Sequence, residues 1–263
     1  MKSIFSCIAV LLLASSGPAQ TTGVIVTGVG ASGPWGTSLD FANPGSTPLR
    51  FNLIPDRRQC VAAPCDYVIP PNGAITVGPD SLQGPLQTVI VVPEEGSVAP
   101  VVRAHVLDPA TRRGADLLAV SARSILERSL PQSLNFPAVT RNATTHANLI
   151  LSGISATPAT FPTDTFAATI QLFDRDGNLL GNRLVASHCA PVIGEAPPSC
   201  PDVFLVDVVA QLGVEAIEGG QLTVTKLQID PPDVPFSQAA AIWGELASVS
   251  SDGPSAVIGG ANP

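Results

Sequence analysis

Charged residues are scarce in this chain, and their scarcity excludes one broad class of partner. Only 13% of the 263 residues are charged, and lysine occurs at just two positions, Lys2 and Lys226. The formal net charge is -8 at pH 7, and the few arginines form no extended basic patch. Such a surface repels phosphate backbones, so we do not expect nucleic acid as a partner.

Aromatic residues are also few, at 5% of the chain. Carbohydrate-binding modules stack sugars on exposed aromatic side chains, but here the tryptophans and tyrosine number only three: Trp35, Trp243 and Tyr67. Trp35 opens the first strand-rich unit and Trp243 lies in the last strand-like run, so we expect each tryptophan to fill a core. We therefore keep glycan binding as an alternative function and not as our main expectation.

A long hydrophobic run is missing except at the N-terminus, where residues 4–14 are apolar. A basic start, this run and a small-residue end at Ala19 are typical of a secretory signal peptide. The run is too short to span a bilayer, and no later segment reaches the required length. We expect residues 1–19 to be a signal peptide and the mature chain to be secreted, extracellular or periplasmic, with no membrane span.

Glycine and proline are frequent instead, at 23 and 26 residues, and they interrupt the chain every several positions. With 45% hydrophobic residues available for a core, this texture predicts many short strands in an all-β protein. Residues 125–130 are the only plausible helical turn, and they mark a boundary. We expect a β-sandwich domain over residues 20–130, a second over residues 131–252, and a flexible tail over residues 253–263.

Two stretches indicate β-hairpins. Residues 39–53 alternate apolar and polar on both sides of a loop of turn residues, which predicts a hairpin with one buried face. The inward set is Leu39, Phe41, Leu49, Phe51 and Leu53. Residues 166–185 repeat the pattern around Asp174-Arg175-Asp176-Gly177. This repetition favours one sandwich unit used twice.

The cysteines that remain after signal cleavage form two close pairs, and each pair follows the second strand of its hairpin. They are Cys60 with Cys65 and Cys189 with Cys200. An even count in an exported chain predicts two local disulfides. Zinc is the alternative, because His188 lies beside Cys189, but the spacings are not those of a zinc knuckle.

Two motifs suggest cofactors, yet each has a better interpretation as a turn. Residues 28–33 match G-x-G-x-x-G, which binds a dinucleotide only if a helix begins there, and Pro34 follows instead. Residues 174–178 suggest a calcium loop, but Val185 stands where the closing Glu is needed, and Asp-Gly favours a hairpin turn. We expect no cofactor.

Catalytic signatures are missing as well. His105, His146 and His188 lie far apart in the sequence, and no G-x-S-x-G, H-E-x-x-H or S-x-x-K motif occurs. A triad assembled from distant loops leaves no such local trace, so a hydrolase stays open as a third reading. Our expectation is that the protein is not an enzyme.

The loop at residues 43–48, followed by an alternating strand and by Pro70-Pro71-Asn72-Gly73, resembles turns of immunoglobulin-like modules in secreted bacterial proteins. The CARDB-type and PapD-like domains use similar turns. The resemblance implies two tandem antiparallel immunoglobulin-like β-sandwiches, and it carries over no functional residue.

These observations favour a secreted, non-enzymatic structural or adhesion module of the cell surface or extracellular matrix. Its expected partners are another protein or copies of itself, met through edge strands, or a surface polysaccharide. The uncharged runs 239–243 and 248–251 predict a contact surface in the C-terminal strand region. The main alternative is an extracellular accessory domain that binds a ligand such as a glycan.

Overall fold

The protein is described from a computed structural model. The described residues are 23–32, 35–55, 66–82, 86–94, 97–108, 110, 113–121, 124–125, 132–154, 165–187, 202–228, 239, 241–251 and 253–260. None of the helices in these ranges has the length and apolar character needed to cross a lipid bilayer.

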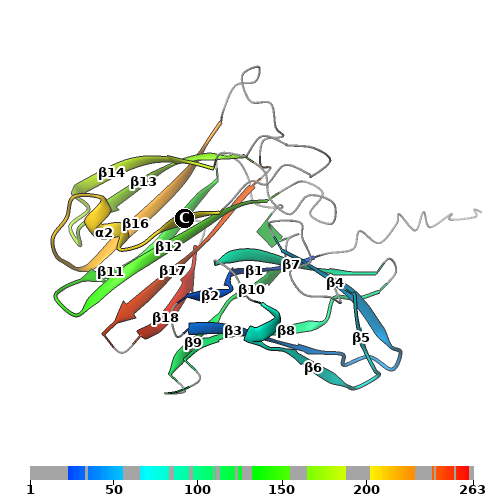
Figure 1. The fold of residues 1–263 in the computed structure, drawn as a ribbon. Helices are drawn as coiled ribbons and strands as arrows, with labels where there is room; N and C mark the ends of the chain where they lie inside the picture. The colour runs from blue at the N-terminus through cyan, green and yellow to red at the C-terminus, as the bar shows by residue number, and fades with distance from the viewer. Residues whose placement is uncertain are drawn as a thin grey trace, which may run out of the picture.

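The fold is all-β, as expected, with four antiparallel sheets. Two sheets use strands from residues 24–121, called here the first half, and two use strands from residues 133–259, the second half (Figure 1). In each half one sheet, called the inner sheet, carries the buried residues that pack against the other half, and the other is called the outer sheet; β9, at the edge of the first half's outer sheet, also lies against β18.

The strands of the first half are arranged as follows. Its inner sheet has the order β10 (Ala119–Ser121), β1 (Val24–Val29), β7 (Gln87–Pro93), β4 (Leu49–Pro55) and β5 (Asp66–Ile69). Its outer sheet has the order β2 (Ala31–Ser32), β3 (Trp35–Ala42), β8 (Val101–Leu107) and β9 (Gly114–Leu117), with β6 (Ala74–Val77) on β3 and a short 3-10 helix, η1 (Pro79–Ser81), after β6.

The second half has the same two-sheet plan. Its inner sheet has the order β15 (Val203–Leu205), β12 (Thr145–Ile154), β17 (Ala241–Ser250) and β18 (Gly253–Gly259). Its outer sheet has the order β11 (Ser133–Arg141), β16 (Ile217–Leu227), β13 (Ala167–Phe173) and β14 (Leu179–Ala186). One short helix, α2 (Val208–Gln211), follows β15.

The first predicted hairpin is wrong, although its inward-facing residues are right. β3 pairs with β6 and β8 in the outer sheet, whereas β4 pairs with β5 and β7 in the inner sheet. The loop therefore crosses from one sheet to the other, and Phe41 meets Phe51 across the core with ring centroids 4.7 Å apart. Alternation fixes which side chains are buried but does not fix the partner strand.

Asn43 holds this crossing in place. The residue is 2% exposed, and its side-chain nitrogen donates to the carbonyl oxygens of Thr47 at 2.8 Å and Ile69 at 3.2 Å. Its side-chain oxygen accepts from the backbone N–H of Gly45 at 2.9 Å. A buried amide with its donors and acceptor satisfied favours one path for the loop.

The second predicted hairpin is confirmed, with β13 and β14 paired antiparallel from Ala167↔Ala186 to Phe173↔Leu179. Gly177 has φ of +83°, a conformation that glycine adopts without steric cost. The Asp174 carboxylate accepts from the backbone N–H groups of Asp176 at 2.9 Å and Asn178 at 2.8 Å. Hydrogen bonds from the side chain and backbone of Asn178 hold the pKa of Asp174 below its usual value. The acidic pattern of this loop thus closes the turn.

The two halves pack through the outward faces of their inner sheets. This contact, called the seam, is a buried cluster of seven residues: Ile25, Ile90, Val92, Ile125, Ile154, Ala241 and Trp243. In Figure 1 the red strands β17 and β18 lie toward the blue strands of the first half. Both faces of β7 are covered as a result, and all seven of its residues are buried.

The first of the two runs predicted to form a C-terminal contact surface is buried instead: Ala239, Ala241, Ile242 and Trp243 are all interior. β17 lies between β12 and β18, and Ala241 and Trp243 are each 4% exposed within the seam. Residues 253–259, expected to be a flexible tail, form β18 instead. The predicted core role of Trp243 is confirmed, and the core it fills joins the two halves.

The glycine motif and the middle of the second half also gain defined structure. After β1 the chain passes Gly30 into β2 and β3, so a strand follows the motif where a dinucleotide site needs a helix. The strand expected over residues 203–209 is only β15, because the backbone turns at Asp207, with φ of +48°, into α2. Of the helical turn expected at residues 125–130, only Ile125 is described, and it is buried in the seam.

Ala241→Lys tests the buried position of β17. An ammonium group at this buried position would lose its hydration among the seven uncharged residues of the seam, so we expect the free energy of unfolding to fall by about 3–5 kcal/mol. Ser251→Lys, at an exposed position just after β17, is the matched control and should change stability by less than about 0.5 kcal/mol. Urea denaturation of both variants is the measurement, and equal stability of the two would contradict a buried β17.

Candidate functional site

A cavity of about 150 Å³ opens along the seam and is lined by both halves. The first half contributes Gly28, Val106 and Leu117, and the second contributes residues of β12, β15, β17 and β18. Most of the lining is aliphatic, but Asn148 and Glu245 also face it. An apolar pocket with a few polar groups is the usual form of a small-molecule site, so this cavity is the first candidate.

Glu245 is the most unusual residue of the cavity. It lies on β17 between Trp243 and Ala247 on the face turned to the first half, and it is 3% exposed. Burial raises the pKa of its carboxyl to about 7, despite opposing hydrogen bonds from the side chain of Trp243 and from the backbone of Leu118 and Thr27. The indole nitrogen of Trp243 is 3.4 Å from its Oε1. A carboxyl that titrates near neutrality is a recurrent feature of functional sites.

We expect Glu245 to make stability depend on pH. Its pKa is about 7 in the folded chain and near 4.5 when exposed, so its contribution is fully present below pH 4.5 and is lost as pH rises through 7. The span corresponds to roughly 3 kcal/mol at most. Unfolding in urea between pH 4 and pH 8 should show this fall in the wild type relative to Glu245→Gln. Parallel pH profiles for the two proteins would refute the assignment.

A second candidate lies on the exposed face of the outer sheet of the first half. His105 on β8 is held between two carboxylates: its Nδ1 is 2.5 Å from Oδ1 of Asp116, and its Nε2 is 3.3 Å from Oδ2 of Asp40. Arg103 reaches the other oxygen of Asp116 at 3.3 Å. Partial burial raises the pKa of Asp116, but the hydrogen bonds from His105 and Arg103 outweigh it and hold that pKa below its usual value.

This cluster borders a groove of about 580 Å³ between β8, β9 and β18. The hydroxyl of Thr76 donates to Oδ1 of Asp40 at 2.6 Å, so the hydroxyl contacts a carboxylate and not the imidazole. Acyl transfer requires a nucleophile hydrogen-bonded to its base. The contacts run from Thr76 to Asp40, from Asp40 to His105 and from His105 to Asp116. Because the hydroxyl does not meet the imidazole, this is a surface hydrogen-bond network and does not have the arrangement of a catalytic triad.

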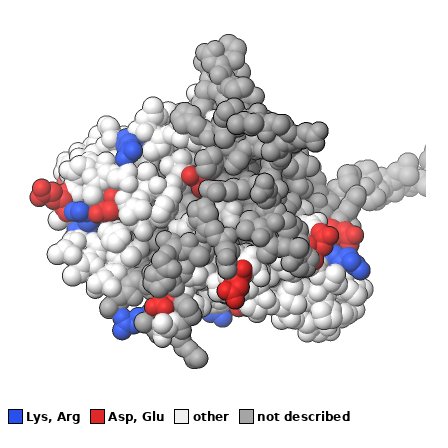
Figure 2. Space-filling model, viewed as in Figure 1, with Lys and Arg blue, Asp and Glu red and all other residues white. Residues whose placement is uncertain are grey.

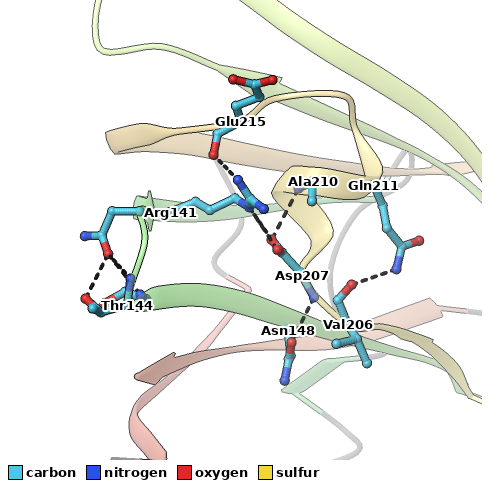
Figure 3. Close-up of polar contacts among 10 residues, drawn as sticks. Arg141, Thr144, Asn148, Val206, Asp207, Ala210, Gln211 and Glu215 are labelled. Atoms are coloured by element: carbon cyan, nitrogen blue, oxygen red, sulfur yellow. Dashed lines mark hydrogen bonds and ion pairs between the residues drawn. The ribbon is translucent and has the colours of Figure 1, made fainter. Parts of the chain in front are cut away.

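The third polar cluster fixes α2 to the rest of the second half (Figure 3). Nε of Arg141 donates to both carboxylate oxygens of Asp207, at 2.9 and 2.8 Å, and its Nη1 donates to the carbonyl oxygen of Glu215. Asp207 in turn accepts from the N–H of Ala210 and donates its own N–H to Oδ1 of Asn148 at 2.9 Å. Asn148 thus links this cluster, called the Arg141 staple, to the wall of the seam cavity.

Arg141→Ala should weaken the second half. The Arg141 and Asp207 side chains are each only 25% exposed, so loss of the guanidinium leaves a half-buried carboxylate and should cost about 1–3 kcal/mol. Arg175→Ala is the control, because its ion pair with Glu218 at 3.5 Å is mostly exposed and contributes at most about 1 kcal/mol. Thermal and urea unfolding compare the two, and equal losses would argue against the staple.

The remaining residues singled out in the sequence have varied positions. Cys60, Cys65, Cys189 and Cys200 lie outside the described residues, as does His188, so the two disulfides remain predictions. His146 is half-buried on β12. Tyr67 stacks against Phe51 with ring centroids 5.3 Å apart, which makes it part of a core rather than a sugar platform.

Within the described part of the chain, no group of three or more His, Cys, Asp or Glu side chains is placed to hold a metal ion.

Sequence reasoning missed Glu245, although a signal was present: it is the only charged residue of an otherwise uncharged run, residues 239–251. Asp40 and Asp116 could not be found that way, since their meeting at His105 depends on the pairing of three strands.

Comparisons of the chain with protein-family models, with curated proteins and with solved structures gave no match.

Proposed function

We propose that the protein is a secreted, non-enzymatic structural or adhesion module of the cell surface or extracellular matrix, built from two tandem immunoglobulin-like sandwiches. The observation that carries the proposal is the seam. Its seven buried residues come from both halves, and Thr88 of β7 also contacts Ser152 of β12 through their hydroxyls. Two domains joined through such a buried contact form one body, as a spacer or scaffold requires.

The contact surface that we propose is β14, the edge strand of the outer sheet of the second half. Leu184 is 65% exposed, Leu179 is 48% exposed, and Leu180 is 40% exposed. β14 pairs with β13 on one side, and Arg183 is its only charged residue. Its sequence has neither the lysines nor the prolines that protect exposed edges, so the strand suits pairing with another strand.

The partner we propose for β14 is a second copy of the chain, with another surface protein as the alternative. Two copies related by a two-fold axis would join their β14 strands antiparallel and bury the same leucines on both sides. The charge pattern supports this choice. On the face that Figure 2 shows, most of the described surface is uncharged and the few acidic and basic residues are scattered, so little local charge opposes the approach of a like surface despite the net charge of -8.

Leu184→Lys tests the contact. We expect the wild-type mature chain to dimerise with rising concentration in light scattering, and to bind the surface of the cells that produce it in a pull-down. The added charge should shift the variant to monomer and reduce its retention at least severalfold, because lysine on an edge strand disfavours pairing. Val101→Lys, at a position 59% exposed on β8, is the matched control and should behave as wild type.

A wild-type chain that stays monomeric at high concentration, and is retained equally well as either variant, would overturn the role of β14. Binding to purified surface polysaccharide with an unchanged Leu184→Lys variant would instead support the accessory glycan-binding role.

A further inference from the structure

We propose that the seam cavity is a binding site for a small apolar amine, whose ammonium group pairs with Glu245 while its hydrocarbon part fills the space between the two halves. The site is separate from the β14 edge, so it stands independently of the proposed module function.

The cavity has the size and lining for such a ligand. Its volume of about 150 Å³ is close to that of an engineered apolar cavity that holds one benzene molecule. Aliphatic side chains of both halves surround it, among them Leu117 on β9 and Ile150 on β12. A ring or short alkyl chain would therefore exchange water for contacts with these hydrocarbon side chains.

The polar end of the cavity selects the class of ligand. Glu245 is almost completely buried, and the groups that hydrogen-bond to its carboxyl, the Trp243 indole and the backbone of Leu118 and Thr27, carry no charge. A buried acid without a charged partner gains most from a cation, because charge-assisted hydrogen bonds are about twice as strong as neutral ones.

Proton balance also favours an amine. If the carboxyl is protonated before binding, a neutral amine takes its proton to give the ammonium carboxylate pair, whereas an ammonium ion displaces that proton to solvent. A neutral alcohol of the same shape exchanges no proton and gains no ion pair. Asn148, held through its Oδ1 by the Asp207 N–H, offers a second polar contact on the same sheet as Glu245, where it pairs with Ala247.

Both halves contribute to the wall, so an occupant would bridge them. A ligand that binds only the folded, closed arrangement raises the melting temperature in proportion to the logarithm of its concentration above Kd. The binding signal can therefore be read on the whole mature chain without knowledge of the natural ligand.

The test uses benzylamine as the probe and benzyl alcohol as its neutral counterpart. We expect a concentration-dependent rise in melting temperature with benzylamine, a clearly smaller one with benzyl alcohol, and at least about tenfold weaker amine binding by Glu245→Gln in calorimetry. Ala247→Leu, which fills the cavity from β17, should lose binding of both probes.

The result that overturns the proposal is no shift with benzylamine, or equal binding of the amine by wild type and Glu245→Gln. Equal affinity for amine and alcohol would also overturn it. If Ala247→Leu does not fold, nuclear Overhauser contacts between the probe ring and the methyl groups of Ile150 and Val257 decide the location, and contacts elsewhere would refute the site.

Discussion

The burial of one sheet face against another between the two halves is the constraint on which the rest of the structure depends. An antiparallel sheet normally has one wet face, yet β7 and most of β17 are covered on both sides. Four sheets thus follow one another as outer, inner, inner and outer layers. The polar network at His105 and the exposed leucines of β14 belong to the outer layers, whereas the buried Glu245 belongs to an inner one.

The position of Glu245 follows from this layering. Along β17 the odd-numbered residues turn toward the first half and the even-numbered residues toward their own core, where Ile242 and Leu246 are buried. In a single isolated sandwich Glu245 would face water. Packing of the first half makes this position interior. The carboxyl is left with uncharged hydrogen-bond donors as partners, and the cavity lies beside it.

The sequence predicted the strands and their buried faces better than their partners. Leu39, Phe41, Leu49 and Phe51 were expected to point to one face, and all four are buried, because the period of two is a local property. Whether β3 and β4 pair or cross between sheets depends on Asn43 meeting the carbonyl oxygen of Ile69, a contact between distant residues. The hairpin at Asp174 to Gly177 was predictable, since its turn chemistry is contained in five residues. The uninterrupted apolar residues that begin β1 (Val24–Val26) and β17 (Ala241–Trp243) also indicate strands with both faces buried.

The order of the chain has a consequence for biosynthesis. All strands of the first half precede residue 122, so that half can form its own core while the remainder is still being made. Its inner sheet then presents Ile25, Ile90 and Val92 to water until Trp243 is made. A nascent chain that folded early would expose this hydrophobic sheet face, which is prone to aggregation, until β17 is made. Folding that waits for β17 would keep this surface from water, so the architecture favours closing the contact between the two halves last.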